Sequence, residues 1–310
     1  MVPSHSKTSS CPATQRRIVK KSTTSQHPHL IFHHLPIELV NHILDIAASS
    51  SRHSCLDICL VASWTRRIAR PHLFHTVIDG FRRSQGFMRQ AAQPPYPTAT
   101  DSQLTAGSLV SGIWSRYRSN NSFHVFKSCD NVAHLALDTL SWQWLSNATM
   151  SRNQNVQLLV IDPGGTPETL SGRFYGPNVL ARITHLRITI VDRYNTVTHL
   201  DNFSSLTHFS VSYCLGGTHD ARELANLLTL PSLMMLVVAL SVQAARRGHW
   251  KKLGKWVRKT RETDRRVYIV EGCGPAQLQE EWEDEVRGGE CVWDRAVRYT
   301  RDWERTLETS

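Results

Sequence analysis

Histidine and cysteine are the side chains in this sequence that could bind a metal ion or attack a substrate. There are 16 histidines and seven cysteines among the 310 residues. His185 and His208 occur at equivalent positions of two similar segments and could share a metal, and Cys55 and Cys59 lie about one helical turn apart. Neither pair belongs to the clustered four-ligand pattern of a zinc site. We therefore expect no metal and no other cofactor.

The glycine pairs Gly164-Gly165 and Gly216-Gly217 are typical of turns rather than of nucleotide binding. No Lys-Ser/Thr pair follows either of them, and no Gly-x-Gly-x-x-Gly pattern occurs. Neither Gly-x-Ser-x-Gly nor His-Glu-x-x-His is found in the sequence. We therefore expect no catalytic residues, and the protein is not predicted to be an enzyme.

Length and composition favour a soluble globular chain with room for two domains. The chain is 40% hydrophobic and 20% charged. It has no run of about 18 apolar residues that could cross a membrane, and its start lacks the apolar core of a secretory signal. The cysteines are odd in number and form no Cys-x-x-Cys, which is typical of a reducing compartment. We expect the protein in the cytoplasm, the nucleus or both, and not at a membrane.

Six short segments in the C-terminal two thirds share an apolar-x-x-apolar-x-apolar pattern. Their central apolar residues are Leu135, Leu159, Leu186, Phe209, Leu236 and Val267. The intervals of 24, 27, 23, 27 and 31 residues are close to the roughly 20–29 residues of a leucine-rich repeat. We expect these segments to stack as parallel strands, with crossover helices at 220–230 and 241–260. The alternative is a generic α/β fold whose buried strands happen to be evenly spaced.

Alternate residues of these strands are expected to point away from the repeat core. In this frame the outer face includes Leu158 and Val160 of the second predicted strand. We expect a target protein to bind the outer face, because solenoids usually bind partners on such a surface. The polar and aromatic contacts would be His185, Arg187, His208 and Tyr268. The alternative is that this face is solvated, or covered by acidic C-terminal helices.

Residues 35–79 predict a small helical unit. Pro36 suits the first turn of a helix, and Glu38 in that turn is favoured by the helix dipole. An apolar stripe follows, Ser49-Ser50-Ser51 breaks the pattern, and a second helix is expected over Cys55 to Ala69. A unit of about 45 residues cannot bury much apolar surface alone. We therefore expect it to leave an apolar face for a partner. The alternative is that these are the first helices of a larger core.

The order of motifs in this unit resembles the F-box-like segments common in fungal proteins. Leu-Pro-x-Glu-Leu begins at Leu35, Val-x-x-Trp ends at Trp64, and Arg-Pro-His-Leu-Phe ends at Phe74. The resemblance implies binding to the Skp-type linker subunit of a cullin-RING (SCF) ubiquitin ligase. By the family pattern, the contact residues would be Leu35, Pro36, Leu39, Ile43, Leu44, Leu60 and Trp64. Ala62 and Ser63 depart from the family, which often has a Cys or Ser followed by a basic residue there.

The net charge of +10 is unevenly distributed. Residues 246–268 hold ten basic and two acidic side chains, whereas residues 269–310 hold five basic and 11 acidic ones. The basic segment 246–266 also contains Trp250 and Trp256, so it could contact phosphates and stack on single-stranded bases. The alternative is a helix that buries its apolar side on the sheet, with its charge neutralised by the acidic run at 280–285. We do not expect nucleic acid to be the main partner.

These patterns together predict an α-β solenoid that follows a small helical F-box-like unit. The expected parts are a disordered basic tail at 1–34, the F-box-like unit at 35–79, a connector at 80–130, a degenerate leucine-rich-repeat-like domain at 131–271 and an acidic helical segment at 272–310. Within the connector, residues 109–117 could form a short helix. The resemblance implies an adaptor that binds the linker and cullin complex through its helices and a target through its repeats. The alternatives are a protein-interaction scaffold without a ligase, or a protein that binds RNA or DNA.

Overall fold

The computed structural model describes residues 35–79, 106–116, 126, 128–138, 155–161, 180–189, 200–213, 221–240, 250–274 and 276–308. The tail predicted at 1–34 and much of the connector predicted at 80–130 lie outside these ranges. The chain divides into two compact units, Met1–Val40 and Asn41–Ser310. Among the described residues, the second unit contains every strand and every helix except the first turn of α1.

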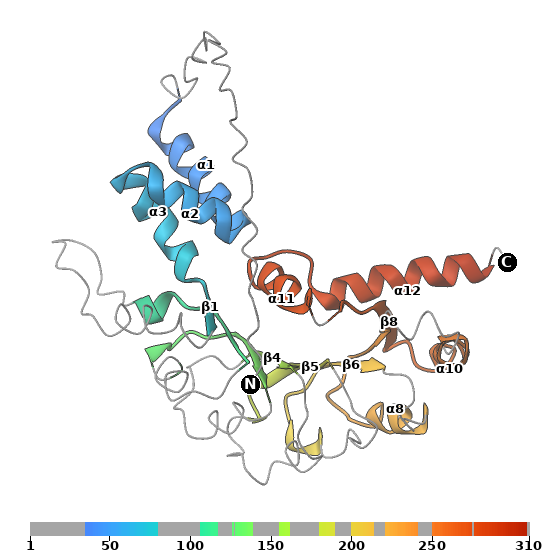
Figure 1. Cartoon of the computed structure of the whole chain (residues 1–310). Coiled ribbons are helices and arrows are strands. Elements are labelled where there is room, and N and C mark those ends of the chain that lie inside the picture. The colour runs from blue at the N-terminus through green and yellow to red at the C-terminus, as the bar shows by residue number, and fades with distance from the viewer. Residues whose placement is uncertain are drawn as a thin grey trace, which may run out of the picture. The chain divides into compact units, whose positions relative to one another are not determined.

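A single parallel sheet forms the centre of the second unit (Figure 1). Its eight strands follow one another in chain order, and each pairs in parallel with the next. The strands are β1 (Thr76–Asp79), β2 (Gly112–Ser115), β3 (His134–Asp138), β4 (Val156–Ile161), β5 (Ile183–Ile188), β6 (His208–Tyr213), β7 (Met235–Leu240) and β8 (Val267–Glu271). The six predicted strands are β3 to β8, so the prediction of an α/β fold with parallel strands is confirmed.

The sheet begins earlier than the sequence pattern indicated. β1 and β2 precede the six predicted strands, and β2 lies within the segment assigned to a connector. The short helix predicted over 109–117 is wrong, since a 3-10 turn at Ala106–Leu109 is followed by strand β2. Ile113 and Trp114 are buried on opposite faces of the sheet, so this four-residue strand has no apolar-polar alternation by which it could be recognised.

Both faces of the sheet are covered by helices, as expected for parallel strands. The larger core lies on one face, where α8 (Ala221–Leu227) contributes Leu224 and α10 (Trp250–Arg261) contributes Val257. On the other face, α11 (Leu278–Val286) contributes Trp282 and α12 (Val292–Glu308) contributes Trp293. Figure 1 shows α11 and α12 on the side of the sheet opposite to α8. These helices lie where helices were predicted, although residues 241–249 of the predicted second crossover are outside the described ranges.

The N-terminal region contains three helices, where the sequence predicts two or three. They are α1 (Ile37–Ser50), α2 (Arg52–Val61) and α3 (Ser63–Phe74). Ser51 separates α1 from α2 and caps α2 by accepting a hydrogen bond from Ser54 N at 3.1 Å. The single helix predicted over Cys55–Ala69 is wrong, because Ala62 adopts an extended backbone between α2 and α3. Thr65 stabilises this break, since its hydroxyl accepts from Ala62 N at 3.0 Å and donates to Ile58 O at 2.8 Å.

No helix in the described part of the chain is long and apolar enough to span a membrane.

Candidate functional site

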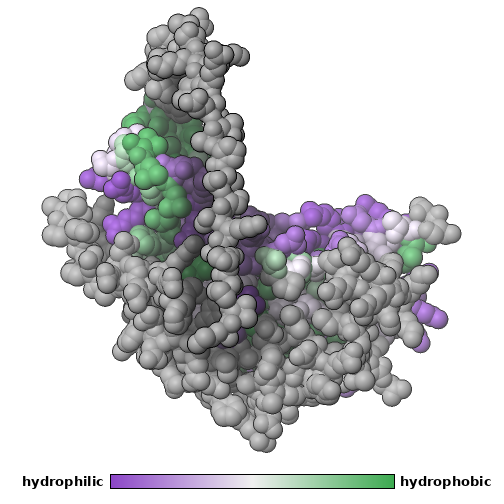
Figure 2. All heavy atoms as spheres, in the orientation of Figure 1, coloured by the Kyte–Doolittle hydropathy of each residue, from purple (hydrophilic) through white to green (hydrophobic). Residues whose placement is uncertain are grey.

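Helices α1 to α3 expose an unusual amount of apolar surface. Large apolar side chains exposed in the described ranges are concentrated on these helices, and Met234 and Leu307 are the exceptions. In the second unit they are Ile43, Ile46, Leu56, Leu60, Val61 and Trp64. Ile37 and Leu39, on the first turn of α1, are also exposed. Figure 2 shows hydrophobic side chains, in green, gathered at the surface of this helical region. Exposed apolar side chains concentrated in one region are typical of an interaction site.

The small size of the local core explains this exposure. Helices α1 to α3 pack around a cluster of mostly small side chains, namely Ala48, Cys55, Ile58, Cys59 and Ala69. The cluster takes in Ile58 of α2 and part of Leu73 of α3, but other large side chains of these helices stay outside it. Leu60 is 80% exposed and Trp64 is 44% exposed. Because three short helices cannot bury these groups themselves, the surface can gain free energy by binding a partner.

The residues predicted to contact a linker subunit fall into two groups. Pro36, Leu39, Ile43, Leu60 and Trp64 are exposed, with Leu39 at 49% and Ile43 at 44%. Leu35 is half-buried, and Leu44 packs against the local cluster. Leu44 therefore belongs to the local packing, whereas the five exposed residues remain available to a partner.

Four exposed apolar residues of α1 to α3 were missed from the sequence. They are Ile46, Leu56, Val61 and Ile37. Helical spacing could have indicated the first two, since Ile46 follows Ile43 by three residues and Leu56 precedes Leu60 by four. Val61 could not be placed in this way, because the unexpected break at Ala62 makes it the last residue of α2.

A second candidate surface is the face of the sheet beneath α11 and α12. The strand registers align His134, Gln157, His185, His208 and Met235 in one row across β3 to β7. The frame predicted for the second repeat segment is wrong by one residue, because Leu158 pairs with Leu135 and lies in the opposite core. That segment is apolar at all but one of its six positions, so its pattern could not determine which residues face which side.

His185 and His208 form a stacked pair on this face. Their ring centroids are 4.2 Å apart and their planes are inclined by 11°, and the ring of Trp293 meets both edge-on at 5.4 and 5.3 Å. Burial lowers the pKa of His185 to about 4, with smaller contributions from His208 and His134, and burial also lowers the pKa of His208. Both rings are therefore neutral at pH 7. In the described ranges, no cluster of three or more potential ligands could hold a metal ion.

Arg187 lies in a buried charged network next to this pair. It is 7% exposed, and its Nη2 is 2.5 Å from Glu281 Oε1 on α11. Its Nη1 is 3.9 Å from Glu285 Oε2, and Arg295 of α12 also reaches Glu281 at 2.9 Å. Burial raises the pKa of Glu281, but the charges of Arg187 and Arg295 and the hydrogen bonds from Cys273 and Arg295 together outweigh burial and hold that pKa below its ordinary value. Burial raises the pKa of Cys273 to about 11, helped by its hydrogen bond to Glu281.

The four residues predicted to bind a target therefore do not lie on an open surface. Arg187 is buried under α11, His185 and His208 are half-buried beside Trp293, and Tyr268 packs against the apolar cluster around α12. The arrangement corresponds to the alternative in which acidic C-terminal helices cover the face. Target binding by these residues stays a prediction, and it would require α11 and α12 to move.

The basic helix α10 lies on the opposite face of the sheet. Leu253 and Val257 are buried in the larger core, whereas Lys255, Arg258 and Lys259 are exposed. Three other cations of this segment have intramolecular partners, and the most distant is Arg265, whose Nη1 is 3.8 Å from Glu304 Oε1. The Nε of Arg261 is 2.7 Å from Glu304 Oε1, and the Nη2 of Arg266 is 2.6 Å from Asp264 Oδ2. The segment therefore has fewer free cations for nucleic acid than its composition indicates.

No protein-family model matches this sequence, and a search of curated proteins found no match either. The two candidate surfaces therefore have to be interpreted from their own residues.

Proposed function

We propose that this protein is a substrate-recognition adaptor of an SCF-type (cullin-RING) ubiquitin ligase. In this proposal α1 to α3 are an F-box-like unit that binds the Skp-type linker subunit. The parallel sheet is a degenerate leucine-rich-repeat-like domain that presents a target protein. Catalysis belongs to the partner enzymes, and the adaptor acts by bringing a target close to them in the cytoplasm or nucleus.

The exposed apolar side chains of α1 to α3 are the observation that supports the proposal most directly. Leu60 and Trp64 sit where the F-box-like motif expects linker contacts, and neither side chain is used by the local core. Burying a Leu or Trp of this kind in an interface supplies roughly 1.5–3 kcal/mol per side chain. A linker that covers both residues would therefore bind mainly through them.

The sheet supports the proposal less directly. Strands in chain order with intervals of 23 to 31 residues between the predicted segments are compatible with a stack of repeats. The predicted target contacts, however, are covered by α11 and α12. A target would bind them only after these helices move, or it would bind elsewhere on the repeat domain.

A pull-down with a purified Skp-type linker subunit tests the proposal. We expect the wild-type chain to capture the linker and Leu60→Asp to reduce capture by about tenfold or more, since a carboxylate would be desolvated in the interface. Leu60 is 80% exposed in the free protein, so this substitution should not disturb folding. Met234→Asp is the matched control, because Met234 is 65% exposed and lies outside α1 to α3.

The same pull-down separates the adaptor from a scaffold that works without a ligase. If the wild-type chain captures no linker, the F-box-like resemblance is structural only and the adaptor proposal fails. The exposed apolar residues would then belong to a different protein contact. If Met234→Asp weakens capture as much as Leu60→Asp does, the effect comes from added charge rather than from the α1 to α3 surface.

A further inference from the structure

Strand β8 is the last strand of the sheet, so one of its two edges has no neighbouring strand among the described residues. On the other edge, Leu236 N donates to Arg266 O at 2.8 Å, and Gly272 N donates to Leu240 O at 2.8 Å. The even-numbered residues of this stretch therefore direct their backbone groups toward β7. Because these groups alternate along a strand, those of Val267, Ile269 and Glu271 point to the outer edge.

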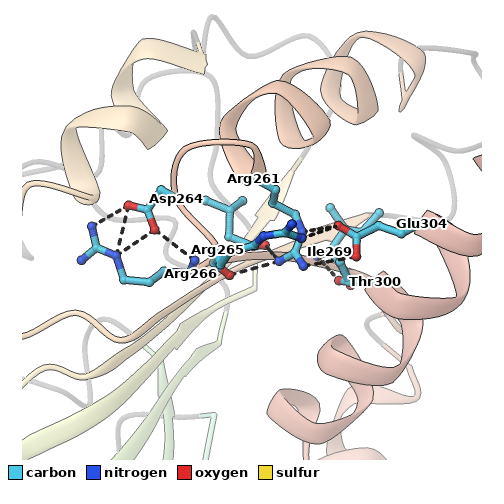
Figure 3. A network of polar contacts seen from close by, with 8 residues as sticks. Arg261, Asp264, Arg265, Arg266, Ile269, Thr300 and Glu304 are labelled. Atoms are coloured by element: carbon cyan, nitrogen blue, oxygen red, sulfur yellow. Dashed lines mark hydrogen bonds and ion pairs between the residues drawn. The ribbon is translucent and has the colours of Figure 1, made fainter.

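Helix α12 covers this outer edge at Ile269, the central residue of β8. The hydroxyl of Thr300 accepts a hydrogen bond from Ile269 N at 2.9 Å and donates one to Ile269 O at 3.1 Å. Thr300 is only 1% exposed, so water does not compete for these bonds. One side chain thus satisfies both backbone groups of Ile269, with which a ninth strand could otherwise pair (Figure 3).

Arg261 of α10 covers a second outward group of β8. Its Nη1 donates to Val267 O at 2.5 Å and to Arg265 O at 3.1 Å. Glu304 of α12 holds the guanidinium in place, with Nε–Oε1 at 2.7 Å and Nη2–Oε2 at 3.3 Å. Figure 3 shows this pair beside Thr300 and Ile269. Side chains of α10 and α12 therefore replace a neighbouring strand at Val267 and Ile269.

We propose that α12 closes this edge against a second copy of the chain. An uncovered edge strand is a template for strand addition, and natural proteins avoid that outcome by covering the edge. Each copy also has a strand of the same parallel sense, β1, at the far end of its sheet. Pairing of β8 with β1 of the next copy would be head to tail, so it would produce a series of oligomers rather than a closed dimer. The Thr300 hydroxyl and the Arg261–Glu304 pair prevent this addition.

The full-length variants Thr300→Val and Thr300→Ser test the role of the hydroxyl. Valine keeps the branched shape but removes both hydrogen bonds, whereas serine keeps the hydroxyl. In Thr300→Val we expect the Ile269 amide to exchange with solvent about tenfold faster than in wild type, because a buried hydrogen bond is lost. We also expect its mass in light scattering to rise with protein concentration. Thr300→Ser should behave like wild type in both measurements.

Two further variants provide a control and a milder change. Thr306→Val removes a hydroxyl that donates to Trp303 O within α12, so it should leave the chain monomeric. Glu304→Gln weakens the support of Arg261 at a partly exposed position and should give a smaller concentration-dependent rise in mass. It replaces Thr300→Val as the deciding variant if circular dichroism shows that Thr300→Val is unfolded.

A folded Thr300→Val chain that stays monomeric at high concentration would overturn the proposal, even if its Ile269 amide exchanges faster. Equal oligomerisation of Thr306→Val would also overturn it, because the effect would then belong to any hydroxyl of the helix. These outcomes do not depend on linker binding, so the edge proposal and the adaptor proposal can fail separately.

Discussion

The two faces of the sheet are both buried, but their central residues differ in kind. On the face toward α8 and α10, one row of aligned residues is apolar throughout. It runs Ile113, Leu135, Leu158, Leu186, Phe209, Leu236 and Val267. On the face toward α11 and α12, the next row is interrupted in its middle. It runs Trp114, Ala136, Leu159, Arg187, Ser210, Val237 and Tyr268.

The two faces therefore contribute to the fold in different ways. The continuous apolar row belongs to one large core, which removes most apolar surface from water and supplies most of the stability. On the other face Arg187 and Ser210 divide the apolar residues into two smaller clusters, one under α11 and one under α12. A buried ion pair adds little net stability, but it penalises every arrangement in which one partner loses the other. We infer that the charged network mainly determines where α11 lies.

The largest expected effect comes from opening a cavity on the apolar face. Phe209 is fully buried at the centre of the apolar row. We expect Phe209→Ala to lower the free energy of unfolding by about 3–5 kcal/mol, measured by urea denaturation. Met234→Ala, at an exposed position of the neighbouring chain segment, should change it by less than about 0.5 kcal/mol. A cost below about 1 kcal/mol for Phe209→Ala would show that this face is not the main core.

The next largest effect concerns the ion pair of the polar face. Arg187→Met removes the cation that forms an ion pair with the buried Glu285, while Glu281 keeps Arg295. We expect a loss of about 2 kcal/mol in urea denaturation, less than the cost of leaving a fully unpaired buried charge. Adding Glu285→Gln to Arg187→Met should recover part of that loss, since the carboxylate that lost Arg187 is then uncharged and the Glu281–Arg295 pair is kept.

The exposed Arg258→Met serves as the control for that series and should be nearly neutral. If Arg187→Met with Glu285→Gln is less stable than Arg187→Met alone, Glu285 stabilises the fold through contacts other than those with Arg187.

A pH effect is also expected from the histidine row. Burial lowers the pKa values of His134 and His185 from 6.5 to about 4 in the folded protein. Between these pH values the unfolded chain binds protons that the folded chain does not. The histidine contribution is therefore complete above about pH 6.5 and decreases as the pH falls toward about 4. Urea denaturation at about pH 7 and pH 5 measures the loss, which His185→Gln should reduce and the exposed His53→Gln should not. Equal stability at both pH values would contradict the burial of these rings.

The smallest effect is expected at Ser210. Its hydroxyl is buried on the polar face and has no hydrogen-bond partner among the described residues. Because burying an unpaired hydroxyl is unfavourable, Ser210→Ala should be neutral or should stabilise the protein by up to about 1 kcal/mol. Thermal unfolding compared with Ser212→Ala on the same strand is the measurement. A clear loss of stability in Ser210→Ala would mean that the hydroxyl has a partner, such as an ordered water.

The sequence by itself determined the features that depend on local patterns. The six strands β3 to β8, the helix at Ala221–Leu227 and the acidic C-terminal helices all follow from apolar spacing and charge within a few neighbouring residues. The exposed stripe on α1 could be predicted for the same reason, since Leu39 and Ile43 have a spacing that the helix places on one side.

Only the tertiary structure decided the features that join distant parts of the chain. The face occupied by β4 was decided by its pairing with β3, because its own residues are almost uniformly apolar. Arg187 and Glu281 meet across 94 residues, so their charges alone could not show that α11 covers the predicted target-binding face. Thr300 and Ile269 meet across 31 residues. A threonine in a helix gives no local sign that it ends a sheet, because its partner is backbone, which is the same at every position of a strand.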